Sequence, residues 1–152
     1  MKAWMFGALC ALVVAGCSPA LQTETTEGSE LPHSLLDPYL RIADALANDS
    51  LDGVQQAAGE LTTESTKLGA PGMRIQTAAA QMTSPGELAD ARTKFANLSV
   101  ALDTYMKGFK MTLPDGVRSA YCPMKQKPWI QEGDVIRNPY YGTEMSTCGE
   151  FR

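Results

Sequence analysis

Between residues 35 and 109 hydrophobic positions recur every three to four residues, which is the period of amphipathic helices. The first such stripe is Leu35, Tyr39, Ile42 and Leu46, and shorter stripes follow at 54–61 and 75–82. The longest stripe runs from 88 to 109, and the capping-box signature at 84–87 predicts that its helix starts at Pro85 with Ser84 as the N-cap. Because the connections are short, we expect antiparallel neighbours in a small up-down bundle of three or four helices.

The pattern changes in the C-terminal segment, residues 109–152. It has no helical stripe, it is rich in aromatic residues and prolines, and it contains Cys122 and Cys148. Turn signals occur at 115–116 and 138–139, a short strand is predicted at 117–121, and a short extended piece at 134–137. We therefore predict a mainly α fold, with an irregular, aromatic- and proline-rich segment packed on the bundle.

The N-terminus predicts export. Lys2 precedes an apolar run at 3–15, which is shorter than the roughly 20 residues that span a bilayer and fits a secretory signal. The next residues, Val14-Ala15-Gly16-Cys17, resemble the lipobox of bacterial lipoprotein precursors. This predicts a signal peptide at 1–16, lipid on Cys17, a polar tether at 17–32 and one domain at 33–152. The alternative is an ordinary secretory signal with an incidental cysteine.

Several classes of function are disfavoured by charge and by missing motifs. The net charge is −4, and no cluster of Lys or Arg stands out, which argues against a nucleic acid partner and against adhesion to anionic lipid. The expected membrane link is therefore the lipid on Cys17. By resemblance to lipoprotein sorting, Ser18 favours the outer membrane, with the domain facing the periplasm. No phosphate-binding glycine loop or nucleophile elbow occurs, so we do not expect an enzyme.

The candidate chemistry lies in two sulfur pairs of the C-terminal segment. Cys122 and Met124 form one pair, and Met145 and Cys148 form the other. Thiolate and thioether ligands select soft metals, Cu(I) above all outside the cytoplasm, whereas zinc prefers nitrogen, oxygen or more thiolates. A catalytic cysteine is disfavoured because the one histidine, His33, lies far away in sequence.

A disulfide is the alternative for the same cysteines. An exported domain with two cysteines usually joins them. A Cys122–Cys148 disulfide would close a loop of about 26 residues and stabilise the fold by roughly 3 to 3.5 kcal/mol. The two states can alternate, since the reduced thiols bind metal and the oxidised pair staples the segment.

Three aromatic residues of the segment have two interpretations. Trp129, Tyr140 and Tyr141 either dock a partner in the envelope or cover the core of the bundle.

The segments that carry these residues resemble a domain family of unknown function. The likeness is longest at 121–124, 129–131 and 136–142, continues at Met145, Cys148 and Gly149, and extends to helical matches near 39–49 and 91–99. Members of the family occur as stand-alone exported proteins and attached to CusB-type adaptors of heavy-metal efflux pumps. The resemblance implies an exported helical domain in copper or related metal handling, with an efflux adaptor as partner. The stretch between Met124 and Trp129 is shorter here than the family pattern leads us to expect.

Overall fold

The computed structural model describes residues 28–152. The predicted leader, the predicted lipidation site Cys17 and most of the predicted tether lie outside the described residues. The elements in chain order are α1 (His33–Ala47), α2 (Val54–Thr66), η1 (Ala70–Gly72), α3 (Met73–Met82), α4 (Leu88–Phe109), β1 (Val117–Cys122), β2 (Lys127–Glu132), η2 (Gly142–Met145) and β3 (Glu150–Phe151).

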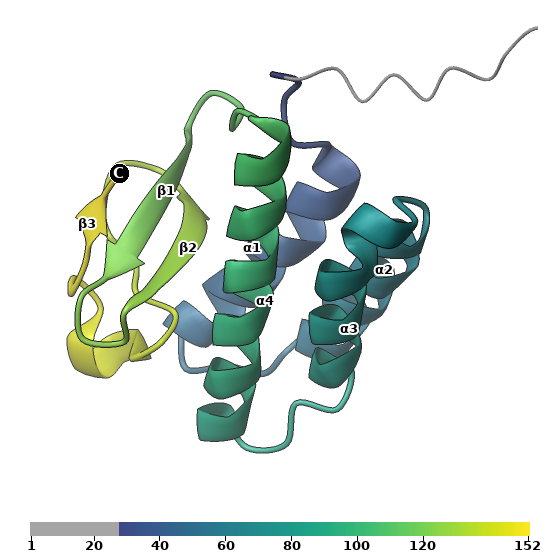
Figure 1. Ribbon diagram of the computed structural model, residues 1–152. Coiled ribbons are helices and arrows are strands. Elements are labelled where there is room, and N and C mark those ends of the chain that lie inside the picture. Colours follow the sequence, from purple (N-terminus) through teal and green to yellow (C-terminus); the bar gives the residue numbers. More distant parts are fainter. Residues whose placement is uncertain (1–27) are drawn as a thin grey trace, which may run out of the picture.

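These elements form three layers. Figure 1 shows the small sheet on one side, α1 and α4 in the middle, and α2 and α3 on the far side. Contacts between α4 and β2 and between α1 and β2 join the sheet to the middle layer, while α2 and α3 contact each other and the helices next to them in the chain. Helices α1 and α4 are therefore covered on both sides, by the sheet and by the second helix pair.

The hydrophobic stripes predicted for the helices form the core. All four positions of the first stripe are at most 1% exposed in α1, and the stripe of α4 is buried from Ala91 to Tyr105. The Tyr39 hydroxyl shares a hydrogen bond with Ser99 Oγ at 2.7 Å and accepts the Ile130 N–H at 3.3 Å. This buried hydroxyl thus joins α1, α4 and β2, with its polar atom fully paired.

The predicted start of the longest helix is wrong by one turn. Helix α4 begins at Leu88, and no side chain caps it. Gly86 has a φ of +70°, which a continuing right-handed helix does not allow, and a side chain there would meet Asp90. Residues 84–87 are therefore a turn that leads into the helix, and their capping-box signature has no structural counterpart.

The predicted fold class is also wrong. The fold is mixed α/β and dominated by helices, because the C-terminal segment forms a three-stranded antiparallel sheet in the order β2-β1-β3. Helices contain 54% and strands 13% of the described residues, and the helical bundle fits in part. The strand expected at 117–121 is β1, but the piece expected at 134–137 is not a strand.

The hairpin of β1 and β2 has a register that pairs Val117 with Glu132 and Cys122 with Lys127. Strand β3 pairs with β1 through Ala120–Phe151 and Tyr121–Glu150. The chain therefore returns along β1 after a long excursion, and this return brings residue 148 to the end of β1.

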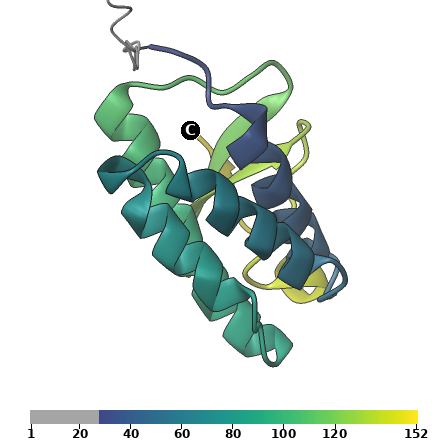
Figure 2. The ribbon, with the colours of Figure 1, turned by 90° about the vertical axis from the view of Figure 1, so that its right-hand side faces the viewer.

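The start of the described chain and the end of β1 lie well apart, the first at one end of the molecule and the second toward the other (Figures 1 and 2). Leu31 is 1% exposed and donates its N–H to the Thr112 carbonyl at 2.9 Å, and Glu30 forms a parallel bridge with Thr112 just after α4. Both ribbon views show this entry at one end and η2 at the other (Figures 1 and 2). Within residues 28–152 no helix combines the length and hydropathy needed to cross a membrane.

Candidate functional site

The two cysteines meet where β1 ends. Cys122 is the last residue of β1, and Cys148 precedes β3, which pairs with β1. Both are free thiols; Cys122 is completely buried and Cys148 is partly exposed. The two cysteines lie close enough that Cys122 raises the pKa of the Cys148 thiol. The two sulfur pairs are far apart in the sequence. The sheet, which sequence analysis did not predict, brings their cysteines together.

The surroundings of Cys148 keep it protonated. Burial first, and then the neighbouring Cys122, raise the pKa of the Cys148 thiol above its ordinary value of 9.0. Because the thiolate is the nucleophile, a raised pKa makes this cysteine a poor attacking group at neutral pH. Cys148 therefore lacks the lowered pKa that activates a nucleophilic cysteine.

Cys122 is held by two N–H donors. The Lys125 backbone N–H donates to Cys122 Sγ at 3.3 Å, and the Asn138 side-chain amide donates to the same sulfur at 3.4 Å. Donors that face a ligating sulfur orient it and tune the metal that it binds. The Cys122 sulfur is therefore fixed on two sides before any ligand arrives.

Asn138 connects the rest of the site. It is completely buried, and its Nδ2 also donates to the Cys148 carbonyl at 2.5 Å. Its Oδ1 accepts the Tyr140 N–H at 2.8 Å, and its own N–H donates to the Ser146 carbonyl at 2.8 Å. Sequence analysis treated Asn138 only as part of a turn signal; its place before a proline does not reveal that its amide reaches both sulfur segments.

The two methionines stand in different places. Met145 ends η2, is partly buried, and accepts the Cys148 N–H on its carbonyl at 3.0 Å, so it lies one turn before that thiol. Met124 lies in the β1–β2 turn, two residues after the buried Cys122, and is 59% exposed. The structure thus brings the two cysteine-bearing segments together and leaves most of the Met124 side chain in solvent.

Metal donors of other kinds do not gather elsewhere in the described part of the chain. Among residues 28–152, no three or more His, Cys, Asp or Glu side chains form a group that could hold a metal ion. His33 lies at the start of α1, where it contacts Asp37 at 3.1 Å on the surface. The donors available for a metal at the candidate site are therefore the two thiols and the thioethers near them.

An arginine-carboxylate pair fastens the segment that carries Asn138. Arg92 of α4 forms an ion pair with Asp49 and donates to the Pro139 carbonyl at 3.2 Å and to the Leu46 carbonyl at 3.1 Å. Asp49 accepts the N–H and the hydroxyl of Thr143. The Thr143 hydrogen bond first, and then Arg92, lower the pKa of Asp49. Helices α1 and α4 are thereby tied to the residues between Asn138 and η2.

The predicted partner surface is not confirmed for two of its three residues. Trp129 is 1% exposed and Tyr140 is 4% exposed, and their rings meet edge to face with centroids 6.0 Å apart. Tyr140 also contacts the Phe95 ring of α4 at 5.8 Å. Trp129 and Tyr140 therefore cover the core, and only Tyr141, which is partly exposed, offers any ring surface to a partner.

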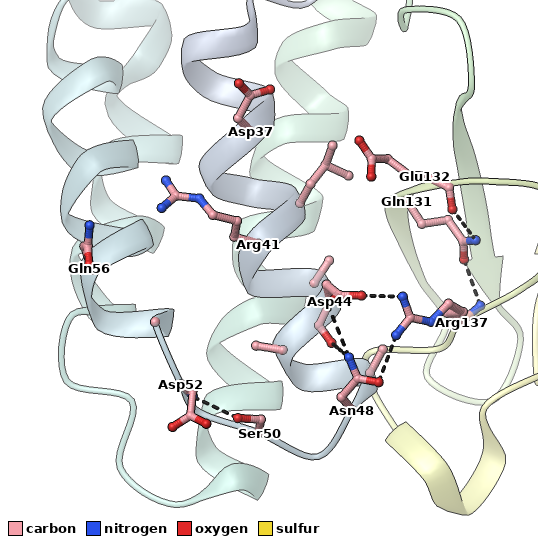
Figure 3. Close-up of a pocket in the computed structure, with 15 residues that line it drawn as sticks. Asp37, Arg41, Asp44, Asn48, Ser50, Asp52, Gln56, Gln131, Glu132 and Arg137 are labelled. Atoms are coloured by element: carbon pink, nitrogen blue, oxygen red, sulfur yellow. Dashed lines mark hydrogen bonds and ion pairs between the residues drawn. The ribbon is translucent and has the colours of Figure 1, made fainter.

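A groove between α1, the start of α2 and the chain after β2 has a volume of about 640 Å³ (Figure 3). Arg137 reaches from the C-terminal segment (residues 109–152, called the tail) to α1, where it pairs with Asp44. It also donates to Asn48 Oδ1 at 2.9 Å. The other charged residues of the lining carry both signs: Asp37, Arg41, Asp52 and Glu132. The arrangement attaches the tail to α1 and presents no convergent set of donors.

No family model, curated protein or solved structure matches the chain in comparisons with known proteins. The resemblance to the efflux-associated domain family stays a prediction, and the argument for function depends on the site itself.

Proposed function

We propose that this chain is a lipid-anchored protein of the cell envelope, tethered through Cys17, that binds or hands over Cu(I) at Cys122 and Cys148. It acts in heavy-metal efflux or homeostasis and is not an enzyme. The observation that carries the proposal is the convergence of the two cysteines on the Asn138 amide, which donates to the Cys122 sulfur and to the Cys148 carbonyl, at the end of the paired strands β1 and β3.

The donor set favours a soft ion. Two neighbouring thiols can both ligate one metal, and thiolate sulfur selects Cu(I) over hard cations. Structural zinc takes four ligands, and the described residues offer no group of three or more His, Cys, Asp or Glu. Met145, one turn before Cys148, is the thioether best placed to add a third soft donor.

Binding is coupled to protons at Cys148. The raised pKa keeps this thiol protonated at neutral pH, and a metal must displace that proton to bind the thiolate. Below the pKa of the thiol, the apparent affinity therefore rises with pH by about tenfold per unit for this one proton. An acidic compartment weakens binding.

The supporting experiment is an anaerobic titration of the reduced protein with Cu(I) against a chelating competitor. We expect one ion per chain, and loss of tight binding in both Cys122→Ser and Cys148→Ser. Stoichiometry below about 0.1, with affinity no better than millimolar (about −4 kcal/mol), would contradict the proposal.

The chain offers a matched pair of methionines for testing thioether ligation. Met124 and Met73 are each 59% exposed, but only Met124 follows a site cysteine. If Met124 is a ligand, Met124→Leu lowers Cu(I) affinity and Met73→Leu does not. Equal affinities in the two variants would remove Met124 from the site and leave the two thiols with Met145.

A disulfide staple is the second candidate, and the same convergence of the two cysteines favours it. Its formation takes two protons and two electrons from Cys122 and Cys148, which pass to an exported thiol–disulfide oxidant. The bond would then attach β3 to the end of β1 covalently. Mass spectrometry before and after alkylation of protein taken directly from the envelope measures it. Two free thiols in that sample contradict the staple, and a mass two hydrogens lower supports it.

A further inference from the structure

The two sulfurs of the site have unequal surroundings. Cys122 is completely buried and fixed by two N–H donors, whereas Cys148 is partly exposed and follows the exposed residues Ser146 and Thr147. A molecule that approaches from solvent therefore reaches Cys148 first. An exchange of ligands at this site has a defined side of entry.

The buried side-chain amide of Asn138 produces this difference between the surroundings of the two cysteines. Asn138 Nδ2 donates both to Cys122 Sγ at 3.4 Å and to the Cys148 carbonyl at 2.5 Å, so a single side chain fixes one sulfur and the backbone of the other. Its remaining polar atoms are paired with Tyr140, Ser146 and Gly142. A rotation of this amide away from the sulfurs would leave a buried donor unpaired, which is costly.

We infer that Asn138 is the positioning residue of the thiol pair, which makes Cys122 the resident ligand and Cys148 the ligand that exchanges with an incoming thiol of a partner. The inference rests on the proposed function and names the route by which the metal enters and leaves. The partner it requires carries a soft sulfur donor that approaches the exposed side of Cys148.

The exchange balances without an oxidant or reductant. The incoming thiol loses its proton and bonds to the metal, the bond between the metal and Cys148 breaks, and Cys148 takes up a proton. The copper remains Cu(I) throughout.

Asn138→Asp is the informative variant, because the carboxylate keeps an oxygen for the Tyr140 N–H and loses the donor to sulfur. The matched control is Gln131→Glu. Gln131 is also a buried amide of the tail that accepts a backbone N–H, from Arg137 at 3.0 Å, and donates to a carbonyl, that of Val135 at 2.6 Å. The Gln131→Glu variant thus measures how much stability is lost when a buried amide becomes a carboxylate at a position away from the thiols.

Two readouts are measured on the mature chain carrying Cys17→Ser, in which Cys122 and Cys148 are the only thiols. The first is the rate of iodoacetamide modification of each thiol in metal-free protein, by mass spectrometry. The second is Cu(I) affinity and its release to bathocuproine disulfonate, with and without reduced glutathione. Thermal melts of both variants show how much of each effect is lost stability.

We expect Cys148 to be alkylated at least about tenfold faster than Cys122 in the parent, because buried groups react only through local opening. Asn138→Asp should bring that ratio toward one and weaken Cu(I) binding by about 10- to 100-fold, the usual size of an outer-shell effect. Glutathione should accelerate release from the parent. Gln131→Glu should match the parent in both readouts.

The outcomes separate the two proposals. If Asn138→Asp behaves like Gln131→Glu in both readouts, the inference is overturned, and Cu(I) binding by the parent still supports the proposed function. If the parent binds no Cu(I) but Asn138→Asp removes the difference in alkylation, the proposed function fails. Asn138 then positions the pair for a disulfide.

Discussion

At the scale of single residues, the close approach of Asp49 and Arg92 to residue 142 shows why this position needs a glycine. Its φ is +58°, and a side chain there would meet both Asp49 and Arg92, which form the ion pair that fastens the tail. Gly142 also donates its N–H to the Asn138 carbonyl at 2.9 Å. The small residue therefore lets the ion pair, the turn and the Asn138 segment fit together.

Gly142→Ala should destabilise the fold by about 1 to 3 kcal/mol, because the new methyl group adds a steric conflict to a left-handed backbone. Urea unfolding measures the change. Gly59→Ala is the control: Gly59 lies inside α2 with nothing within 4 Å of the added carbon, and alanine there should stabilise by about 0.5 to 1 kcal/mol. Similar losses in both variants would contradict the role assigned to the approach at Gly142.

We predict that Asp49 contributes to the stability of the fold and that this contribution is lost in acid. Its pKa in the folded protein is lowered from 3.8, so its contribution is fully present above that unfolded value and is lost as pH falls through the lower folded value. Asp49→Asn should therefore flatten the decline of unfolding free energy below pH 4. Urea unfolding at pH 7 and at pH 3 measures it. An identical decline in the parent and the variant would show that the ion pair does not act in this way.

At the scale of elements, the helices were predictable and most of the sheet was not. The three- to four-residue stripes lie on buried faces in α1, α3 and α4, because each helix covers the core with one side. Strand β2 lacks alternation, since Trp129, Ile130 and Gln131 are buried in succession. Pro128 further disguises it, although a proline is compatible with an edge strand, which β2 is.

The candidate site was predictable in part for the same reasons. The paired sulfurs at 122–124 and 145–148 marked the two segments, but the two-residue β3 that brings them together is too short to leave a pattern. The donors at Asn138 and Lys125 reach sulfur through a buried amide and a turn N–H, and both depend on tertiary structure. The burial of Trp129 and Tyr140 likewise follows from a sheet that sequence patterns did not show.

The attachment of β2 to the tail can be tested through Tyr140. Its hydroxyl donates to the Pro128 carbonyl, and burial raises the pKa of this phenol. Tyr140→Phe leaves that carbonyl without its donor and should destabilise by about 1 to 2 kcal/mol. The partly exposed Tyr141→Phe serves as control and should stay within about 0.5 kcal/mol of the parent. Chemical unfolding followed by circular dichroism compares the two variants. Equal free energies of unfolding would contradict the role assigned to the Tyr140 hydroxyl.

At the scale of the whole molecule, the sheet and the helices share one core. Trp129 of β2 belongs to the same buried cluster as Leu46, Ile75 and Leu98 of the helices. The tail is therefore an integral part of the domain and not an appendage laid on a finished bundle. Loss of the tail would expose the middle helix layer.

This shared core predicts a single cooperative unfolding transition. The two tryptophans of the sequence are Trp4, within the predicted leader, and Trp129, so fluorescence of the mature chain reports the sheet alone. Circular dichroism at 222 nm reports the helices. We expect coincident melting curves from the two probes. A fluorescence midpoint well below the helical one would show that the sheet unfolds as a separate unit.

The direction of β1 separates Cys122 from the point where the chain enters the domain. The chain enters the domain beside the end of α4, and β1 then runs for about 20 Å toward the opposite pole, where it delivers Cys122. If the chain is anchored through Cys17 and binds Cu(I) as proposed, the metal site lies well away from the point where the chain enters the domain. Proteins that deliver or take up the metal would then reach the site from the aqueous compartment. This arrangement suits transfer of the metal between the two membranes better than exchange at the lipid surface.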